Sequence, residues 1–206
     1  SACSADSRRG AHEAAQEAKR AVASGPPADY AGEVRREELH FGHIALSFET
    51  WPQWRIGSSV WPSGQLLARA LAEGKTSQLP EVRGLRVAEL GAGPGLPGLV
   101  CGALGAAEVA ITDRAELLPL MARNIELNGL ASTCRAEALD WSLAAGSAVA
   151  AAGSGEAPWD VVLAADVVYF EEQDPLIEAM TALLAPRRSV LVLAYRERSG
   201  ADRMYL

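Results

Sequence analysis

The sequence predicts an α/β domain built around a mostly parallel sheet, and two observations carry this prediction. From residue 85 onward, short apolar runs alternate with stretches of helical periodicity, which is the pattern of strands joined by crossover helices. A glycine-rich turn separates the first of these apolar runs from the helix that follows, as in open α/β sheets that bind ligands at the carboxyl ends of their strands. The chain of 206 residues is long enough for one such domain.

The sheet is expected to contain five strands connected by helices. We place the strands at residues 85–90, 109–112, 134–139, 161–164 and 190–194. Helical spacing of apolar residues predicts helices at 97–104, 115–128 and 175–184. Because a crossover between parallel strands is almost always right-handed, this alternation leaves few arrangements open.

Two segments have no sustained apolar pattern. Residues 1–37 combine Ser, Ala, Arg and Glu with a Gly-Pro-Pro sequence, so we expect a flexible N-terminal extension and place the folded domain at 38–206. Residues 144–155 consist mainly of Ala, Gly and Ser, and are predicted to form a surface insert.

A hairpin, a loop and a first helix are expected to precede the parallel strands. Apolar residues that alternate at 39–48, around a central Gly-His, predict a β-hairpin. A tryptophan-rich loop at 50–64 then leads to a helix at 65–73, which Gly74 is placed to end.

Composition and charge disfavour several classes of protein. The formal net charge of −7 at pH 7 provides no basic face for nucleic acid phosphates, so we expect no nucleic acid partner. No apolar run approaches the roughly 18 residues needed to span a bilayer, and no membrane partner is expected. Cys3, Cys101 and Cys134 lack CxxC spacing, which predicts neither disulfides nor a metal site and fits the cytoplasm, with the nucleus as an alternative.

The glycine-rich turn is the first candidate binding element. Glycines at positions 91, 93, 95 and 98 follow the first parallel strand, where residues without side chains let a ligand approach the backbone. The spacing Gly93-x-Gly95-x-x-Gly98 also fits the dinucleotide pattern. Two prolines that stiffen the turn, and Glu89, which would repel a pyrophosphate, argue against a dinucleotide. Tight packing alone is the alternative explanation of the glycines.

Acidic residues follow the second and third parallel strands at the same edge of the sheet. Asp113 lies about 20 residues beyond the glycines, where a carboxylate can accept both hydroxyls of a ribose; alternatively, it caps the next helix. Asp140 offers an acceptor for an exocyclic amine, and Trp141 offers an aromatic face for a purine or is simply a core residue. These positions predict a nucleoside ligand.

Asp166 and Tyr169 leave the fourth parallel strand. In a continuing strand their side chains would face opposite sides, whereas a turn at this point would bring them together. A carboxylate beside an aromatic ring can hold a cationic amine through charge pairing and cation–π attraction.

Taken together, these motifs resemble those of a known family. The segments that carry the resemblance are Val60-Trp61-Pro62-Ser63-Gly64, VAELGAGPGLPGLVCGALGA, Ile111-Thr112-Asp113, Asn124-x-x-x-Asn128, Leu139-Asp140-Trp141 and AADVVY. Over 38–206 the chain is similar to the seven-β-strand S-adenosylmethionine-dependent methyltransferases, and more narrowly to the protein lysine methyltransferases of methyltransferase family 16, of the methyltransferase-like 21 type. The resemblance implies a Rossmann-like class I sheet, S-adenosylmethionine as cofactor and a protein substrate that presents a lysine.

The resemblance also implies roles for single residues. The candidate cofactor-binding residues are Trp61, Glu89, Gly91, Ala92, Gly93, Asp113, Asp140, Trp141 and Ala165. Among them, the turn and Trp61 are expected at the amino-acid end of the cofactor, Asp113 at the ribose and Trp141 at the adenine. Asp166 and Tyr169 match the family's signature for receiving the target side chain and are the candidate catalytic residues.

The chain departs from the family's pattern at its end. After the fifth parallel strand, family members continue with a helix and an antiparallel hairpin that supply the last two of seven strands, whereas this sequence stops at Leu206. It also begins at Ser1 without a methionine, so we expect a C-terminally truncated fragment with an open sheet edge.

Other functions stay open at this point. The methyl acceptor could be a histidine or a small amine in place of lysine. A catalytically silent cofactor-binding interaction module is a second possibility. A nicotinamide oxidoreductase is the third, and it is opposed by Glu89 and the two prolines of the turn.

Overall fold

The computed structural model describes residue 26 and residues 30–74, 79–147, 149, 158–169 and 174–197. The predicted extension, residues 1–37, therefore lies mostly outside the described residues. Its last three positions belong instead to strand β1 (Arg35–Phe41). The sequence pattern missed them because they are polar and exposed, and pairing with a neighbouring strand holds them in place.

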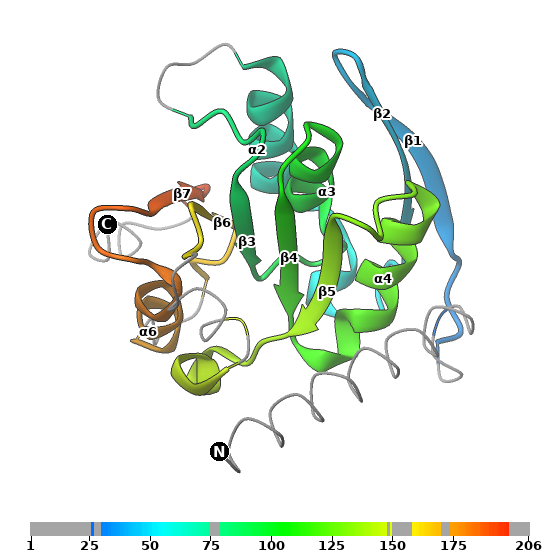
Figure 1. Ribbon diagram of the computed structural model, residues 1–206. Helices are drawn as coiled ribbons and strands as arrows, with labels where there is room; N and C mark the ends of the chain where they lie inside the picture. The colour runs from blue at the N-terminus through cyan, green and yellow to red at the C-terminus, as the bar shows by residue number, and fades with distance from the viewer. Residues whose placement is uncertain are drawn as a thin grey trace.

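Five parallel strands form the main sheet, in the order β5-β4-β3-β6-β7 (Figure 1). They are β3 (Arg86–Leu90), β4 (Glu108–Asp113), β5 (Cys134–Ala138), β6 (Val161–Ala165) and β7 (Val190–Ala194). The predicted strands are confirmed, with ends that differ by no more than one residue. The chain builds outward from β3 on one side and then returns to its other side, so a ligand crevice is expected at the carboxyl end of β3.

The helices of the described residues are α2 (Pro62–Glu73), α3 (Leu96–Ala103), α4 (Leu118–Leu127) and α6 (Asp174–Leu183). Helix α2 begins earlier than predicted because Pro62 fits its first turn, where a missing N–H costs nothing, and it ends at Gly74 as expected. The helix predicted at 115–128 is divided into the 3-10 turn η2 (Ala115–Leu117) and α4. None of the described helices is both long and apolar enough to cross a membrane.

The predicted hairpin forms a small sheet of its own. Strand β2 (Ile44–Thr50) pairs antiparallel with β1, and Gly42 makes the connection with a φ of 62°. The hairpin lies on the α3 and α4 side of the domain, far from α6 (Figure 1).

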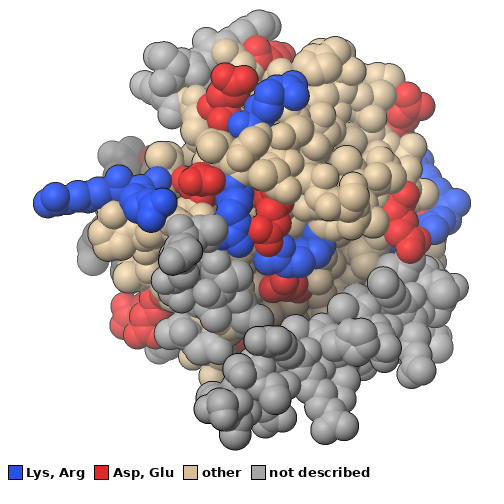
Figure 2. Space-filling model, viewed as in Figure 1, with Lys and Arg blue, Asp and Glu red and all other residues tan. Residues whose placement is uncertain are grey.

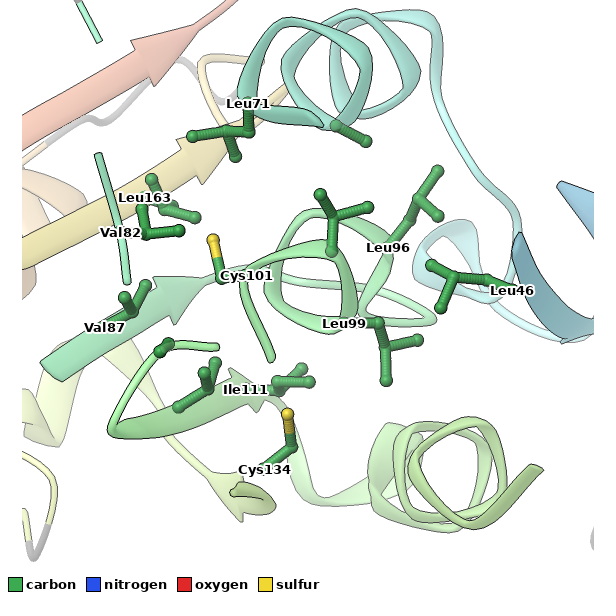
Figure 3. Close-up of a cluster of buried hydrophobic side chains, with 14 of the residues drawn as sticks. Leu46, Leu71, Val82, Val87, Leu96, Leu99, Cys101, Ile111, Cys134 and Leu163 are labelled. Atoms are coloured by element: carbon green, nitrogen blue, oxygen red, sulfur yellow. The ribbon is translucent and has the colours of Figure 1, made fainter. Parts of the chain in front are cut away.

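Each face of the main sheet carries its own hydrophobic cluster. Because side chains alternate along a strand, Val87 faces the cluster that includes α2, α3, α4 and the hairpin, whereas Ala88 faces the cluster that includes α6. Figure 3 shows the first cluster, in which Leu71, Leu99 and Ile111 come from different elements. Cys101 and Cys134 belong to the same cluster as free thiols, and burial raises the pKa of Cys134 to about 12.

The surface insert predicted at 144–155 is wrong at Ala144 and Val149. Ala144, in the 3-10 helix η3 (Trp141–Gly146), is 1% exposed, and Val149 is also 1% exposed. The indole Nε1 of Trp159 donates a hydrogen bond of 2.9 Å to the carbonyl of Val149. Composition did not reveal this packing, because small residues fit both surfaces and tight contacts. Residues 148 and 150–157 lie outside the described residues.

Trp159 anchors the cluster beneath α6. Its side chain is fully buried, and the guanidinium carbons of Arg86 and Arg135 lie 4.5 and 5.4 Å from its ring centroid. The same arginines form ion pairs with Glu108. Trp159 therefore connects the hydrophobic cluster that includes α6 to the ion pairs of Arg86 and Arg135 with Glu108.

We expect Trp159→Ala to lower the free energy of unfolding by about 3–5 kcal/mol, because it leaves a large cavity and removes both cation–π contacts. Ile177→Ala on α6, where the side chain is 47% exposed, is the control and should change it by less than about 1 kcal/mol. Urea unfolding monitored by circular dichroism measures both. Equal losses in the two variants would contradict this account of Trp159.

Candidate functional site

The glycine turn between β3 and α3 has a backbone that few other residues could adopt. Gly91, Gly93 and Gly95 have φ values of 60°, 56° and 91°. A Cβ on Gly91 would lie 2.7 Å from Cγ1 of Val167, so a side chain there would clash. The turn is closed by the N–H of Gly95, which donates to the carbonyl of Ala92 at 2.9 Å. The glycines thus serve both the conformation of the turn and its close packing.

Asp113, at the end of β4, is hydrogen-bonded to the turn. Its Oδ2 accepts from the N–H of Gly93 at 2.8 Å, and its Oδ1 accepts from the N–H of Arg114 at 2.7 Å. Burial raises the pKa of this carboxyl despite both hydrogen bonds. The residue that caps η2 is Arg114, without a side-chain capping bond, so the capping alternative for Asp113 is wrong.

Trp141 lies beside the same turn. The Cβ position of Gly91 is 3.1 Å from Cζ2 of Trp141, and the half-buried indole packs against the cluster beneath α6. The preceding Asp140 caps η3: its Oδ1 accepts from the N–H and the hydroxyl of Ser142 at 3.0 and 2.6 Å, and these bonds lower its pKa. The structure thus brings Asp113 and Trp141 together at the glycine turn.

Two alanines also belong to the predicted cofactor set. Ala92 is half-buried in the turn, and its N–H donates to the carbonyl of Thr112 at 2.9 Å. Ala165 is half-buried at the end of β6, next to the bend at Asp166. Both lie at the carboxyl edge of the sheet, as predicted.

Glu89 lies deeper than the other acids. It is 1% exposed on β3, and its Oε2 accepts from the N–H of Gly98 at 2.8 Å, in the first turn of α3. Burial raises its pKa to about 8, with a smaller contribution from the nearby charge of Asp113 and in spite of the hydrogen bond from Gly98. Glu89 therefore fixes the helix that follows the glycine turn, a role that the sequence did not indicate.

Asp166 marks a sharp bend after β6. Its φ is 59°, which is unusual for a residue other than glycine, and its N–H donates to the carbonyl of Ala194 at 2.8 Å. Its Oδ2 accepts from the N–H of Ser63 at 3.1 Å, so the carboxylate lies at the N-terminus of α2. The side chain is buried, with 6% exposure.

Tyr169 lies three residues further, at the surface. Its side chain is 43% exposed, whereas the intervening Val167 and Val168 are buried. The chain therefore turns where the sequence allowed either a turn or a continuing strand. The side chain of Asp166 is therefore buried in the domain, whereas that of Tyr169 lies at the protein surface.

A segment that we call the tryptophan loop, residues 51–61, covers the glycine turn. The carbonyl of Gly57 is 2.7 Å from the Cβ position of Gly93, and a Cβ on Gly57 would lie 2.5 Å from Cδ1 of Leu117. Trp61, which is 43% exposed, donates from Nε1 to the carbonyl of Ile56 at 3.0 Å. A cavity of about 460 Å³ is lined by residues 53–56 and 59–61.

The sequence pattern missed three residues of this arrangement. They are Gly57, Ser63 and Asn124, which contact Gly93, Asp166 and the turn carbonyl of Pro94, respectively. Asn124 and Ser63 stood in recognised motifs without an assigned contact. Gly57 gave no signal, because its importance comes from packing between distant segments.

Glu89→Gln should make stability less dependent on pH. The folded-state pKa of about 8 exceeds the ordinary value of 4.5, so the unfolded chain releases this proton at lower pH and the free energy of unfolding falls as pH rises between these values. Gln keeps an acceptor for the N–H of Gly98, and we expect the variant to exceed the parent in stability at pH 8. Urea unfolding at pH 5 and pH 8 measures this; equal pH dependence in both proteins would contradict it.

Comparison with known proteins gives a consistent assignment. A lysine methyltransferase family model matches residues 43–206. The chain is 33% identical over 201 residues to protein-lysine N-methyltransferase EFM6 of Saccharomyces cerevisiae, covering 84% of this chain and 81% of that protein. It is 34% identical over 164 residues to protein N-lysine methyltransferase METTL21A of Mus musculus, covering 80% and 72%.

Solved structures share the fold. A SAM-dependent methyltransferase from Agrobacterium tumefaciens matches with a TM-score of 0.56 and 22% identity, covering 86% of this chain and 57% of that chain. The 16S rRNA N2 G1207 methyltransferase RsmC of T. thermophilus, in complex with AdoMet and guanosine, matches with a TM-score of 0.56 and 24% identity, covering 82% and 43%. With a family model that spans most of its length and relatives of this identity, the chain belongs to the lysine methyltransferase family.

Proposed function

We propose that this protein is an S-adenosylmethionine-dependent N-methyltransferase that methylates a lysine side chain of a protein substrate. The observation that carries the proposal is the convergence of the glycine turn, Asp113 and Trp141 at the carboxyl edge of the sheet. Its relatives, named protein-lysine N-methyltransferases, support the choice of reaction and acceptor.

The residues at this edge fit S-adenosylmethionine. Gly91 and Ala92, the half-buried part of the glycine turn, present backbone to a ligand, Asp113 provides a carboxylate for the ribose hydroxyls, and Trp141 provides an aromatic surface for the adenine. We assign the amino-acid end to Trp61 and the turn residues, the exocyclic amine to Asp140 and the methionine part to Ala165. Glu89 lies beneath the turn and accepts from the N–H of Gly98, and the ammonium of a bound cofactor would favour its ionised form. When bound, the cofactor supplies a methyl group on a positively charged sulfur.

Asp166 and Tyr169 are assigned to the target lysine. A lysine ammonium with a pKa near 10.4 must lose a proton before it can attack, which costs about 4.6 kcal/mol at pH 7. A neighbouring carboxylate would raise this pKa, so Asp166 binds and aims the amine, and the proton leaves to solvent. Tyr169 offers its ring to the cation at the rim. In-line placement of the amine nitrogen supplies most of the acceleration.

We also propose a cytoplasmic protein that binds neither nucleic acid nor a metal. On the face in Figure 2, basic side chains are interspersed with acidic ones and form no continuous patch among the described residues. The net charge of −7 points the same way. Within the described part of the chain, no group of three or more His, Cys, Asp or Glu residues could hold a metal ion.

Asp113→Asn should weaken binding of S-adenosylmethionine about tenfold, because the amide retains an acceptor for the N–H of Gly93 but loses one for the ribose. Asp174→Asn, an exposed change at the start of α6, is the control and should leave the dissociation constant unchanged. Calorimetry with S-adenosylmethionine and with NAD measures both. Preferential binding of NAD would overturn the proposed cofactor.

Asp166→Asn should reduce methyl transfer about 10- to 100-fold while cofactor binding stays intact, because the amide still accepts from the N–H of Ser63 but lacks the charge that holds a cation. The assay incubates a proteome with enzyme and isotopically labelled cofactor, and mass spectrometry identifies the modified residues. Label on histidine or on small amines would show that the methyl acceptor is not the proposed lysine. Cofactor binding without any label would favour a silent interaction module.

A further inference from the structure

Asn124 of α4 is a fully buried polar residue outside the residues assigned above. Its exposure is 0%, and its amide group is nevertheless satisfied. Oδ1 accepts from the N–H of Glu49 at 2.8 Å, and Nδ2 donates to the carbonyl of Glu49 at 3.0 Å. Nδ2 also donates to the carbonyl of Pro94 at 3.0 Å. One side chain thus joins β2, α4 and the glycine turn.

The hydrogen bond from Asn124 to Pro94 is important for the glycine turn because Pro94 lies in the middle of that turn. Pro94 stands between Gly93 and Gly95, both of which have positive φ values. Proline has no N–H, so its carbonyl is the only backbone group through which Pro94 itself can be held by a hydrogen bond. The N–H of the neighbouring Gly93 is held by Asp113. Asn124 and Asp113 therefore hold the adjacent residues Pro94 and Gly93 from two different elements.

The hairpin side of this junction is itself fixed. The carboxylate of Glu49 is 1% exposed and accepts from Nε1 of Trp51 at 2.8 Å and from Nε of Arg36 at 2.7 Å. Arg123 of α4 lies 3.6 Å from the same carboxylate. Asn124 thus holds the turn against an anchored strand, since Glu49 cannot move without breaking several bonds.

Asn128, one turn further along α4, provides a natural comparison. Its Oδ1 accepts from the N–H of Ser47 at 2.9 Å, and its Nδ2 donates to the carbonyl of Ser47 at 2.8 Å. It makes the same paired contact with β2 as Asn124 does. Asn128 also donates from Nδ2 to the carbonyl of Asn124 at 2.7 Å, whereas Asn124 donates to the carbonyl of Pro94 in the turn.

We propose that Asn124 is a positioning residue for the cofactor: its hydrogen bond to the carbonyl of Pro94 holds the glycine turn in the conformation that binds S-adenosylmethionine. This inference rests on the cofactor site proposed above. Asn124 does not touch the cofactor and acts through the turn. The hairpin, which lies outside the main sheet, thereby becomes part of the support of the cofactor site.

The test compares Asn124→Asp with Asn128→Asp. Both exchanges keep the size and the acceptor and replace a donor by an oxygen that repels a carbonyl. Calorimetry of the full chain with S-adenosylmethionine should give a dissociation constant about 5- to 20-fold higher for N124D, at a stoichiometry near one, and less than about twofold higher for N128D. A purely structural role would lower the stoichiometry and the melting temperature without changing the dissociation constant.

Further variants keep the outcome decisive. If N124D does not fold, Asn124→Ser, which removes the reach to Pro94 without introducing a charge, replaces it with the same expectation. Equal weakening by the changes at positions 124 and 128, or an unchanged dissociation constant in the 124 variant, overturns the inference. Asp113→Asn distinguishes a failure of this inference from a failure of the proposed cofactor site. If Asp113→Asn weakens cofactor binding and the 124 variant does not, only the inference about Asn124 fails. If Asp113→Asn has no effect on binding, the proposed cofactor site itself is refuted.

Discussion

The constraint on which the rest of the structure depends is the crowding around Gly93. Its N–H donates to Asp113 at the end of β4, and the carbonyl of Gly57 occupies the space that a Cβ would need. Three segments that are distant in sequence therefore meet at one residue without a side chain. The position of the acid, the shape of the turn and the path of the tryptophan loop all follow from this contact.

Three acidic residues of the site make the same kind of hydrogen bond. Glu89, Asp113 and Asp166 each accept a backbone N–H from another segment, from Gly98, Gly93 and Ser63 respectively. Each carboxyl group thus helps to set the path of the chain at the same edge of the sheet. Burial, and to a lesser degree the charge of Asp113, raise the pKa of Glu89, and a ligand with cationic groups at this edge would favour its ionised form.

The central strands β3, β4 and β6 were predictable because burial of both sheet faces produces short, mainly apolar runs between helical stretches. The start of the hairpin at Arg35 was not predictable, because the first residues of β1 are polar and exposed. Only their pairing with β2 holds them in the strand. The buried Ala144 and Val149 escaped prediction because the Ala, Gly and Ser around them carry no apolar period, and the cluster in which they pack, with Trp159, is supplied by the fold.

The sequence by itself determined the parallel α/β architecture, the glycine turn and the identity of the acidic and aromatic residues at the strand ends, since strand period and glycine spacing are local properties. Only the tertiary structure decided that Asp166 is buried at the start of α2, that Glu89 holds α3, and that Gly57 and Asn124 brace the turn. These roles depend on contacts between residues that are 9 to 103 positions apart in the sequence. A local sequence pattern does not show which residues at such separations come into contact.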